Sequence, residues 1–256
     1  MRLQLLSSAG SHRLRAIALA ALWMLPQAAT ADAPLYLVTG NAAPFATERH
    51  DGFFDLIAAE MFRRIGVRAE IRTHESSARA LVNADQGVDD GVMARVRGLE
   101  KQYPNLIMVR EKLFDNDFVA CTLGEGLSTP GWPGLDSRHV AFIRGWKIFE
   151  SNLRSHQETT QVRDARQLFE LLRHQRADVA LYERWQALWY ARELALPIRV
   201  IEPPLAREEM FVYLHLKHAA LVPRAAAALA DMKRDGSYRR IFEVTLGALQ
   251  PRLPAR

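Results

Sequence analysis

Apolar and polar positions alternate along the first part of the chain in blocks that predict strands and helices in turn. Apolar runs predict strands at residues 35–39, 67–72 and 88–93. Apolar residues at helical spacing predict intervening helices at 52–65 and 78–84. A β-α-β-α-β order favours a parallel sheet covered by helices, and ligands of such sheets gather at the carboxyl ends of the strands.

The same pattern restarts after residues 124–134, which are rich in Gly and Pro. The remaining predicted strands are 106–109, 114–123, 139–143, 178–181, 198–201 and 210–216, and the remaining predicted helices are 147–154, 165–173, 183–194, 220–234 and 238–246. We therefore expect two α/β lobes joined by two chain segments, lobe 1 from 32–120 plus 208–256 and lobe 2 from 121–207. A cleft between lobes is a preferred site for a small molecule.

The first 31 residues have the pattern of a cleavable secretory signal peptide. Arginines precede a short apolar run at 16–25, and the small residues Ala29 and Ala31 fit the cleavage rule. The run is too short to span a bilayer, and no Cys lies near the cut for lipid attachment. Removing residues 1–31, which hold three arginines and no acidic residue, lowers the formal net charge from +5 to +2. We expect a periplasmic protein without a nucleic-acid or anionic-membrane partner.

The sequence contains few motifs that indicate catalysis, metal binding or disulfide formation. Cys121 is the single cysteine, so no intrachain disulfide can form, and its apolar neighbours predict a buried, inert thiol. His215 and His218 have no cluster of further ligands, so we predict neither a metal site nor a cofactor. The common sequence motifs of hydrolases, nucleotide-binding proteins and metalloproteases are absent from the sequence.

Three stretches carry a resemblance to a known family. They are GNAAPFATERHDGFFDLIAAEMFRRIGV at 40–67, ADVALYER at 177–184 and LHLKHAALVPRAAAALADMKRDGSYRRIFEVTLG at 214–247. In this order they resemble the family 3 extracellular solute-binding proteins, the periplasmic receptors of polar amino acid ABC transporters. The resemblance implies a two-lobed, periplasmic-binding-protein-like (type II) fold with a two-segment hinge.

The family's anion clamp is expected at the loop after the third strand. The arginine that takes the ligand carboxylate in the family falls on Leu99, so Arg95 is the first candidate replacement and Arg97 the second. Two arginines on such a loop suit an anion, because a guanidinium grips a carboxylate with two parallel hydrogen bonds. The alternative is that both are solvated loop charges.

Six further residues are candidates for ligand contact. The family's amine-binding acid aligns with Glu183, which alternatively begins a helix. Backbone N–H groups of Arg144 and Gly145 are expected to meet an anion, with Trp146 lining the cleft or packing locally. Phe45, after Pro44, is expected on the cleft wall, and Arg79 either faces the cleft or is solvated.

The leading functional prediction is a monomeric, non-catalytic periplasmic protein that captures an amino acid or organic anion for an ABC permease. One alternative is a ligand sensor for a membrane signalling protein. Another is an enzyme similar to the cyclohexadienyl dehydratases, with Asp89, Asp90 or Glu183 as general acid. The fold alone does not separate these functions.

Overall fold

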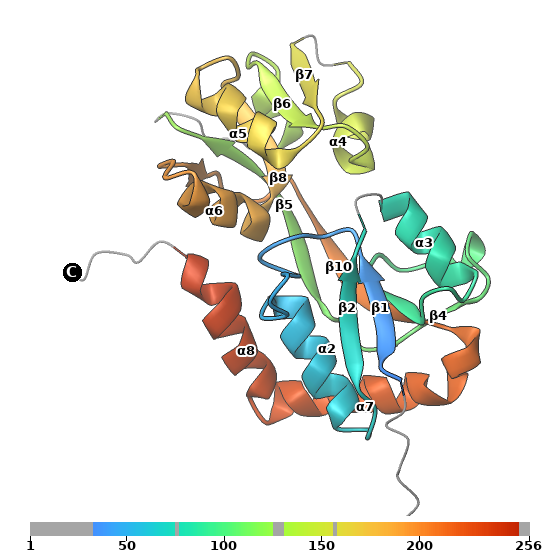
Figure 1. The fold of residues 1–256 in the computed structure, drawn as a ribbon. Coiled ribbons are helices and arrows are strands. Elements are labelled where there is room, and N and C mark those ends of the chain that lie inside the picture. The colour runs from blue at the N-terminus through green and yellow to red at the C-terminus, as the bar shows by residue number, and fades with distance from the viewer. Residues whose placement is uncertain (1–32, 75–76, 125–130, 156–157, 251–256) are drawn as a thin grey trace, which may run out of the picture. The chain divides into compact units, whose positions relative to one another are not determined.

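The computed structural model describes residues 33–74, 77–124, 131–155 and 158–250. The signal-peptide prediction concerns residues outside these ranges. Contacts group Pro34–Arg256 into one unit, and the following description concerns that unit. Figure 1 shows its strands and helices.

The first sheet has the strand order β2-β1-β3-β10, with β4 paired to β10. Its strands are β1 (Leu35–Thr39), β2 (Ala69–Thr73), β3 (Gly91–Arg95), β4 (Leu106–Met108) and β10 (Ala206–His215). β1 pairs in parallel with both β2 and β3, whereas β10 runs antiparallel to β3 and β4. The predicted parallel β-α-β-α-β order is therefore confirmed.

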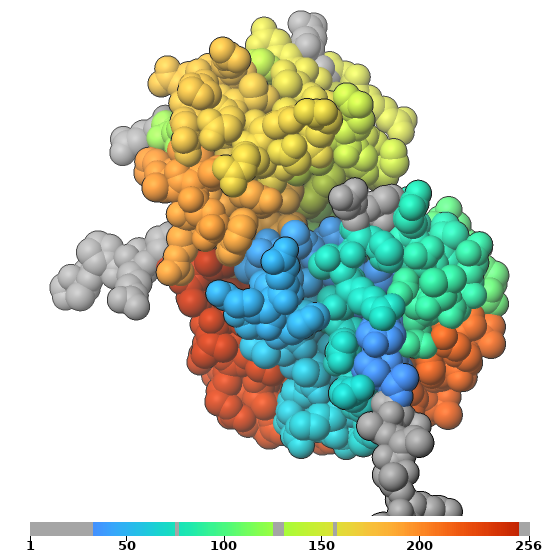
Figure 2. Space-filling model, in the orientation of Figure 1, coloured from blue at the N-terminus to red at the C-terminus, as the bar shows by residue number. Residues whose placement is uncertain are grey.

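Helices cover both faces of this sheet. They are α2 (Phe53–Arg63), α3 (Ser77–Asp85), α7 (Val222–Arg234) and α8 (Ser237–Thr245). The apolar faces of α2 and α7 pack with Leu37 and Val212 on one side, and Ala80 of α3 packs with Val38 on the other. Figure 2 shows that N-terminal and C-terminal elements lie against each other, as the contacts of α2 with α7 and α8 require.

The second sheet has the order β10-β5-β8-β6-β7, with β9 paired to β5. Its further strands are β5 (Phe114–Thr122), β6 (Val140–Ile143), β7 (Thr159–Val162), β8 (Val179–Glu183) and β9 (Arg199–Val200), and its helices are α4 (Lys147–Asn152), α5 (Ala165–Arg173) and α6 (Arg184–Glu193). β6 pairs in parallel with β7 and β8, and β8 pairs antiparallel to β5. Short 3₁₀ turns fall at Leu99–Lys101, Trp132–Leu135, Leu216–Leu221 and Gly247–Leu249.

β5 and β10 connect the two sheets. β10 pairs with β5 from Ala206 to Met210 and with β3 and β4 from Phe211 to His215. β5 begins at Phe114, in an aromatic cluster where its ring centroid lies 5.3 Å from that of Phe45. The change of sheet therefore occurs near the Phe114–Met210 pair.

The element predictions differ most from the structure in four places. The strand expected at 210–216 already begins at Ala206. β3 begins at Gly91 instead of residue 88, and Val88 is 67% exposed. β7 was not predicted, because Thr159–Val162 lacks an apolar run. The helix expected at 220–234 is divided: a 3₁₀ turn ends at Leu221, and α7 begins next to Pro223, which suits a first helical turn.

Candidate functional site

A cavity of about 740 Å³ opens where several strands end. Its walls include residues 94–97 at the end of β3, residues 145–148 at the start of α4 and residues 207–210 of β10. Gly40 and Asn41, which follow β1, Ser77 of α3 and Asn116 of β5 also line it. Carboxyl ends of parallel strands from both sheets therefore meet one space, which is the usual position of a ligand in α/β proteins.

Arg95 supplies a positive charge to this cavity. Its Nη1 donates to the backbone oxygen of Ala94 at 3.3 Å. Its Nε and Nη2 are buried and have no hydrogen-bond partner among the described residues. Burial lowers the pKa of Arg95 to about 10, so the guanidinium stays charged at neutral pH. A buried charge without an acceptor is costly, and an anion in the cavity would remove that cost.

A β-bulge in β3 positions Arg95. Arg95 pairs with Phe211 and Val92 with Tyr213, so β3 has one more residue than β10 between these pairs. Ala94 within the bulge has a φ of 56°, a left-handed conformation that is uncommon for a residue with a Cβ. Bulges of this kind change the direction of a side chain next to functional sites.

The loop after Arg95 is held by the buried Tyr213, whose hydroxyl donates to the Val96 carbonyl at 2.8 Å. Arg97 in this loop lies 3.2 Å from Glu209 Oε2, and its guanidinium lies 4.4 Å from the centre of the Phe211 ring. Arg97 lines the cavity but already has a carboxylate partner. Of the two predicted arginines, Arg95 is the one with buried nitrogens, Nε and Nη2, that lack a partner among the described residues.

The structure brings Gly145 and Trp146 to the cavity, and Trp146 both lines it and packs locally, whereas the role of Gly145 differs from the one expected. The Gly145 N–H donates to Glu150 Oε1 at 2.8 Å, so this group is not free for an anion. The Trp146 ring stacks on Phe149, with centroids 5.6 Å apart and an interplanar angle of 6°. Arg144 is exposed and lies outside the lining, and its N–H donates to the Val162 carbonyl.

Three more predicted site residues, besides Arg144, lie outside the cavity lining. Phe45 is fully buried and stacks on Phe54 at 4.6 Å, so it is a core residue in this structure and not the expected wall. Arg79 lies on the exposed side of α3. Glu183 is 2% exposed, and its Oε2 accepts the Gln186 N–H at 2.8 Å as the N-cap of α6. Burial raises the pKa of Glu183 to about 8.

Sequence reasoning missed the polar residues that β5 and β10 contribute. Asn116 and Glu208 are cross-strand partners, and both line the cavity. Asn116 is 6% exposed, and its side chain forms no hydrogen bond within the described residues. The signal for this pair was the sequence Asp115-Asn116-Asp117, which places three polar residues inside an apolar strand.

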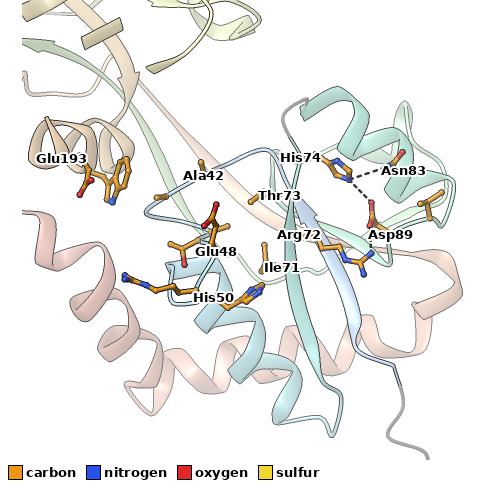
Figure 3. A pocket seen from close by; sticks show the side chains of 16 residues that line it. Ala42, Glu48, His50, Ile71, Arg72, Thr73, His74, Asn83, Asp89 and Glu193 are labelled. Carbon is orange, nitrogen blue, oxygen red and sulfur yellow. Dashed lines mark hydrogen bonds and ion pairs between the residues drawn. The ribbon is translucent and has the colours of Figure 1, made fainter. Parts of the chain in front are cut away.

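A second cavity, of about 1170 Å³, lies beside β2 (Figure 3). On one side of it, Asp89 lies 3.6 Å from His74 and 4.0 Å from Arg72, and Asn83 lies 3.4 Å from His74. No group of three or more metal-ligating side chains occurs in the described ranges. Within those ranges, none of the helices has the length and apolar character needed to cross a membrane.

No protein-family model matches this sequence, and no curated protein matches it. Solved structures do resemble the chain. The GluR0 ligand-binding core from Nostoc punctiforme in complex with L-glutamate has a TM-score of 0.68 and 16% identity, covering 83% of this chain and 99% of that chain. A histidine kinase sensor domain with similarity to periplasmic binding proteins has a TM-score of 0.69 and 16% identity, covering 86% and 98%.

The substrate-binding protein of an amino acid ABC transporter has a TM-score of 0.63 and 16% identity, covering 84% of this chain and 99% of that chain. At such identities the likeness establishes the fold and not the function. The predicted α/β, two-lobed, periplasmic-binding-protein-like fold is thereby confirmed.

Proposed function

We propose that this protein is a periplasmic solute-binding protein that captures a small polar ligand with an anionic group for ABC-type uptake. The observation that carries the proposal is the buried guanidinium of Arg95, which borders a cavity and has two nitrogens without a partner among the described residues. Folding alone gives no reason to bury an unpaired charge, whereas an anionic ligand would pair with it. The fold shared with ligand-binding cores and a transporter's binding protein supports this role.

The rest of the cavity suits a ligand with an apolar part. Trp146, Ile148 and Phe118 lie in its lining, and Trp146 packs edge to face against Phe118 at 6.0 Å. Rigid aromatic surfaces bind apolar groups with little loss of side-chain freedom. We propose that the segments of β5 and β10 that join the sheets act as the hinge around a bound ligand.

Binding measurements on the purified chain test this proposal. We expect at least one amino acid or small organic acid to raise the melting temperature and to bind in calorimetry. Arg95→Gln is expected to lower the affinity for that ligand by roughly 10- to 100-fold, because it removes a charge-assisted hydrogen bond. Arg144→Gln is the matched control, since Arg144 is exposed and outside the cavity. Absence of any anionic ligand would refute the proposal.

A sensing role is the second candidate, favoured by the likeness to a histidine kinase sensor domain. The two roles share ligand capture and differ in the membrane partner, an ABC permease or a signalling protein. Deleting the gene and measuring uptake of the identified ligand separates them. Loss of uptake supports transport, and unchanged uptake with a lost transcriptional response supports sensing.

Turnover of prephenate or arogenate by the purified chain would contradict a non-catalytic role.

A further inference from the structure

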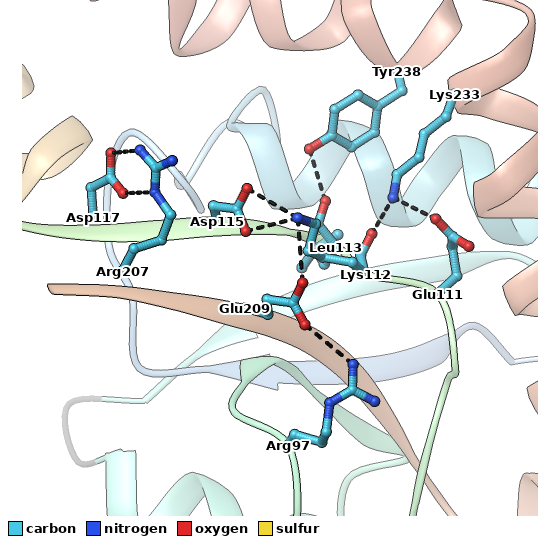
Figure 4. Close-up of polar contacts among 10 residues, drawn as sticks. All are labelled: Arg97, Glu111, Lys112, Leu113, Asp115, Asp117, Arg207, Glu209, Lys233 and Tyr238. Atoms are coloured by element: carbon cyan, nitrogen blue, oxygen red, sulfur yellow. Dashed lines mark hydrogen bonds and ion pairs between the residues drawn. The ribbon is translucent and has the colours of Figure 1, made fainter.

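The two faces of the β5–β10 ribbon differ in their charge balance. Successive residues of a strand point to opposite faces, so Asp115 and Asp117 share a face with their partners Glu209 and Arg207. Arg207 binds Asp117 through two hydrogen bonds of 2.6 and 2.9 Å. Lys112 lies 2.9 Å from Asp115 and 3.6 Å from Glu209. Figure 4 shows this set of ion pairs, in which every acid has a cationic partner.

The other face of the ribbon carries the cross-strand pair Asn116 and Glu208. Both residues line the cavity that contains Arg95. No ion pair to Glu208 occurs among the described residues. Asn116 is 6% exposed, and its side-chain amide has no hydrogen-bond partner among the described residues. Among the described residues, the cavity therefore has a cation without an ion-pair partner on one wall, and on another an acid without such a partner beside a side-chain amide that is available to a ligand.

Glu183, which was expected to bind an amine of the ligand, is not available for that role. Its Oε2 caps α6 by accepting the Gln186 N–H, and the residue lies outside the lining. Burial raises the pKa of Glu183 to about 8, which favours the uncharged form at neutral pH. Glu208, by contrast, is exposed and lines the cavity.

We propose that Glu208 and Asn116, on the strands that join the sheets, bind a cationic group of the ligand whose anionic group binds Arg95. The inference rests on the proposed function and deepens it: the ligand is a small dipolar ion, and Glu208 sets the preference for its ammonium group. A carboxylate and an amide oxygen together accept two hydrogen bonds from an ammonium, which has three to donate. Exchanging Glu208 for Gln keeps the size and removes the charge.

Paired probes that differ only in the ammonium group test the assignment. The pairs are L-glutamate and glutarate, L-phenylalanine and 3-phenylpropanoate, and 4-aminobutanoate and butanoate, titrated calorimetrically into the full chain. We expect the amine-bearing member of at least one pair to bind on the order of tenfold more tightly. In Glu208→Gln that preference is expected to fall to within about twofold, while the amine-free member binds unchanged or more tightly.

Asp115→Asn is the matched control, because it removes the same charge from the paired strand on the opposite face. It is expected to leave the preference intact. A preference that persists in Glu208→Gln, or equal affinity of both members of every pair that binds, would overturn the role of Glu208 and leave the binding function standing. If the folded chain binds neither the six probes nor any other amino acid or small organic acid, both the role of Glu208 and the proposed function are wrong.

Discussion

At the residue scale, Arg95 combines a binding role with a cost in stability. Its Nε and Nη2 are buried and have no acceptor within the described residues. Arg95→Met keeps most of the side-chain length and removes the charge. We expect the ligand-free variant to be more stable by about 1–3 kcal/mol, because the penalty for an unsatisfied charged group disappears. Urea denaturation of the ligand-free protein measures this difference.

Arg97→Met is the control for that measurement. Arg97 is 61% exposed at its side chain and pairs with Glu209, so its removal is expected to change stability by less than about 1 kcal/mol. A loss of stability in Arg95→Met would show that the guanidinium contributes to the fold and is not held for a ligand.

Glu183 gives a second prediction at this scale, in the dependence of stability on pH. Burial raises the pKa of Glu183 from 4.5 to about 8, so the folded protein retains a proton that the unfolded chain releases. This contribution to stability is complete below pH 4.5 and is lost as the pH rises to about 8, by up to about 1.4 kcal/mol per pH unit. Glu183→Gln keeps an oxygen for the Gln186 N–H and should lack this loss.

Urea denaturation at several pH values should therefore show that the stability of Glu183→Gln rises relative to that of the wild type as the pH increases from 5 to 8. Glu150→Gln is the control, because the pKa of Glu150 is shifted in the opposite direction to that of Glu183. A hydrogen bond from Lys147 and one from the Gly145 N–H lower the pKa of Glu150, so its carboxylate favours folding at neutral pH. A constant difference between Glu183→Gln and the wild type across this pH range would contradict the buried, protonated state.

Sequence reasoning identified Arg95 because a short apolar run precedes it and a strand was expected to end there. It did not reveal that Arg97 has a partner, since Glu209 is 112 residues away in the chain. Phe45 was expected on the cleft wall, but the neighbouring aromatic residues of α2 and β5 enclose it. Which face a side chain takes, and which distant residue meets it, depend on packing that local pattern does not encode.

At the element scale, β3 depends on a glycine at its first position. A Cβ at Gly91 would lie 2.3 Å from the Tyr213 carbonyl oxygen and 2.8 Å from Leu37 Cδ2. Gly91→Ala should therefore push β3 away from its neighbours and destabilise the protein by about 1–3 kcal/mol, with weaker ligand binding through Arg95. Urea denaturation and calorimetry with the identified ligand measure the two effects.

Gly124→Ala is the matched control, because its nearest neighbour to an added Cβ is Thr122 Oγ1 at 3.9 Å. It should change neither stability nor affinity appreciably. Equal stabilities of the two variants would mean that β3 can shift without cost, and the bulge would then not fix the position of Arg95.

Element predictions succeeded where amphipathic periodicity was strong. The helix expected at 165–173 coincides with α5, and that expected at 238–246 differs from α8 by one residue at each end. β7 was missed because an edge strand needs few apolar residues. The start of β3 was placed too early because the apolar Val88, which was counted as part of the strand, is exposed and precedes it.

At the scale of the whole molecule, Asp117 links the segments that join the two sheets. Its carboxylate accepts two hydrogen bonds from Arg207 of β10 and one from Arg184 of α6, at 3.1 Å. Arg184 is also paired with Glu202. Sequence pattern predicted two crossings of the chain but not this pairing, which joins residues 67 and 90 positions apart.

Asp117→Ala should destabilise the protein by about 1–2 kcal/mol at neutral pH, because it leaves the largely buried Arg184 with Glu202 alone, while solvent at Arg207 limits the loss. Although burial raises it, hydrogen bonds from Arg207 and the charge of Arg184 lower the pKa of Asp117 below 3.8 overall. The contribution of Asp117 is therefore present above pH 3.8 and is lost as the pH falls through the lowered pKa.

The loss of stability in Asp117→Ala, measured by urea denaturation, should therefore become smaller as the pH falls. Glu70→Gln is the control, since its contact with Arg68 is exposed and 3.9 Å long, and it should have little effect at any pH. If Asp117 connects the two sheets, X-ray scattering of the variant in solution should also indicate a broader range of conformations. The reason is that the strands between the sheets would bend more freely. An unchanged scattering profile and stability would show instead that the backbone pairing of β5 with β10 is sufficient to hold the junction.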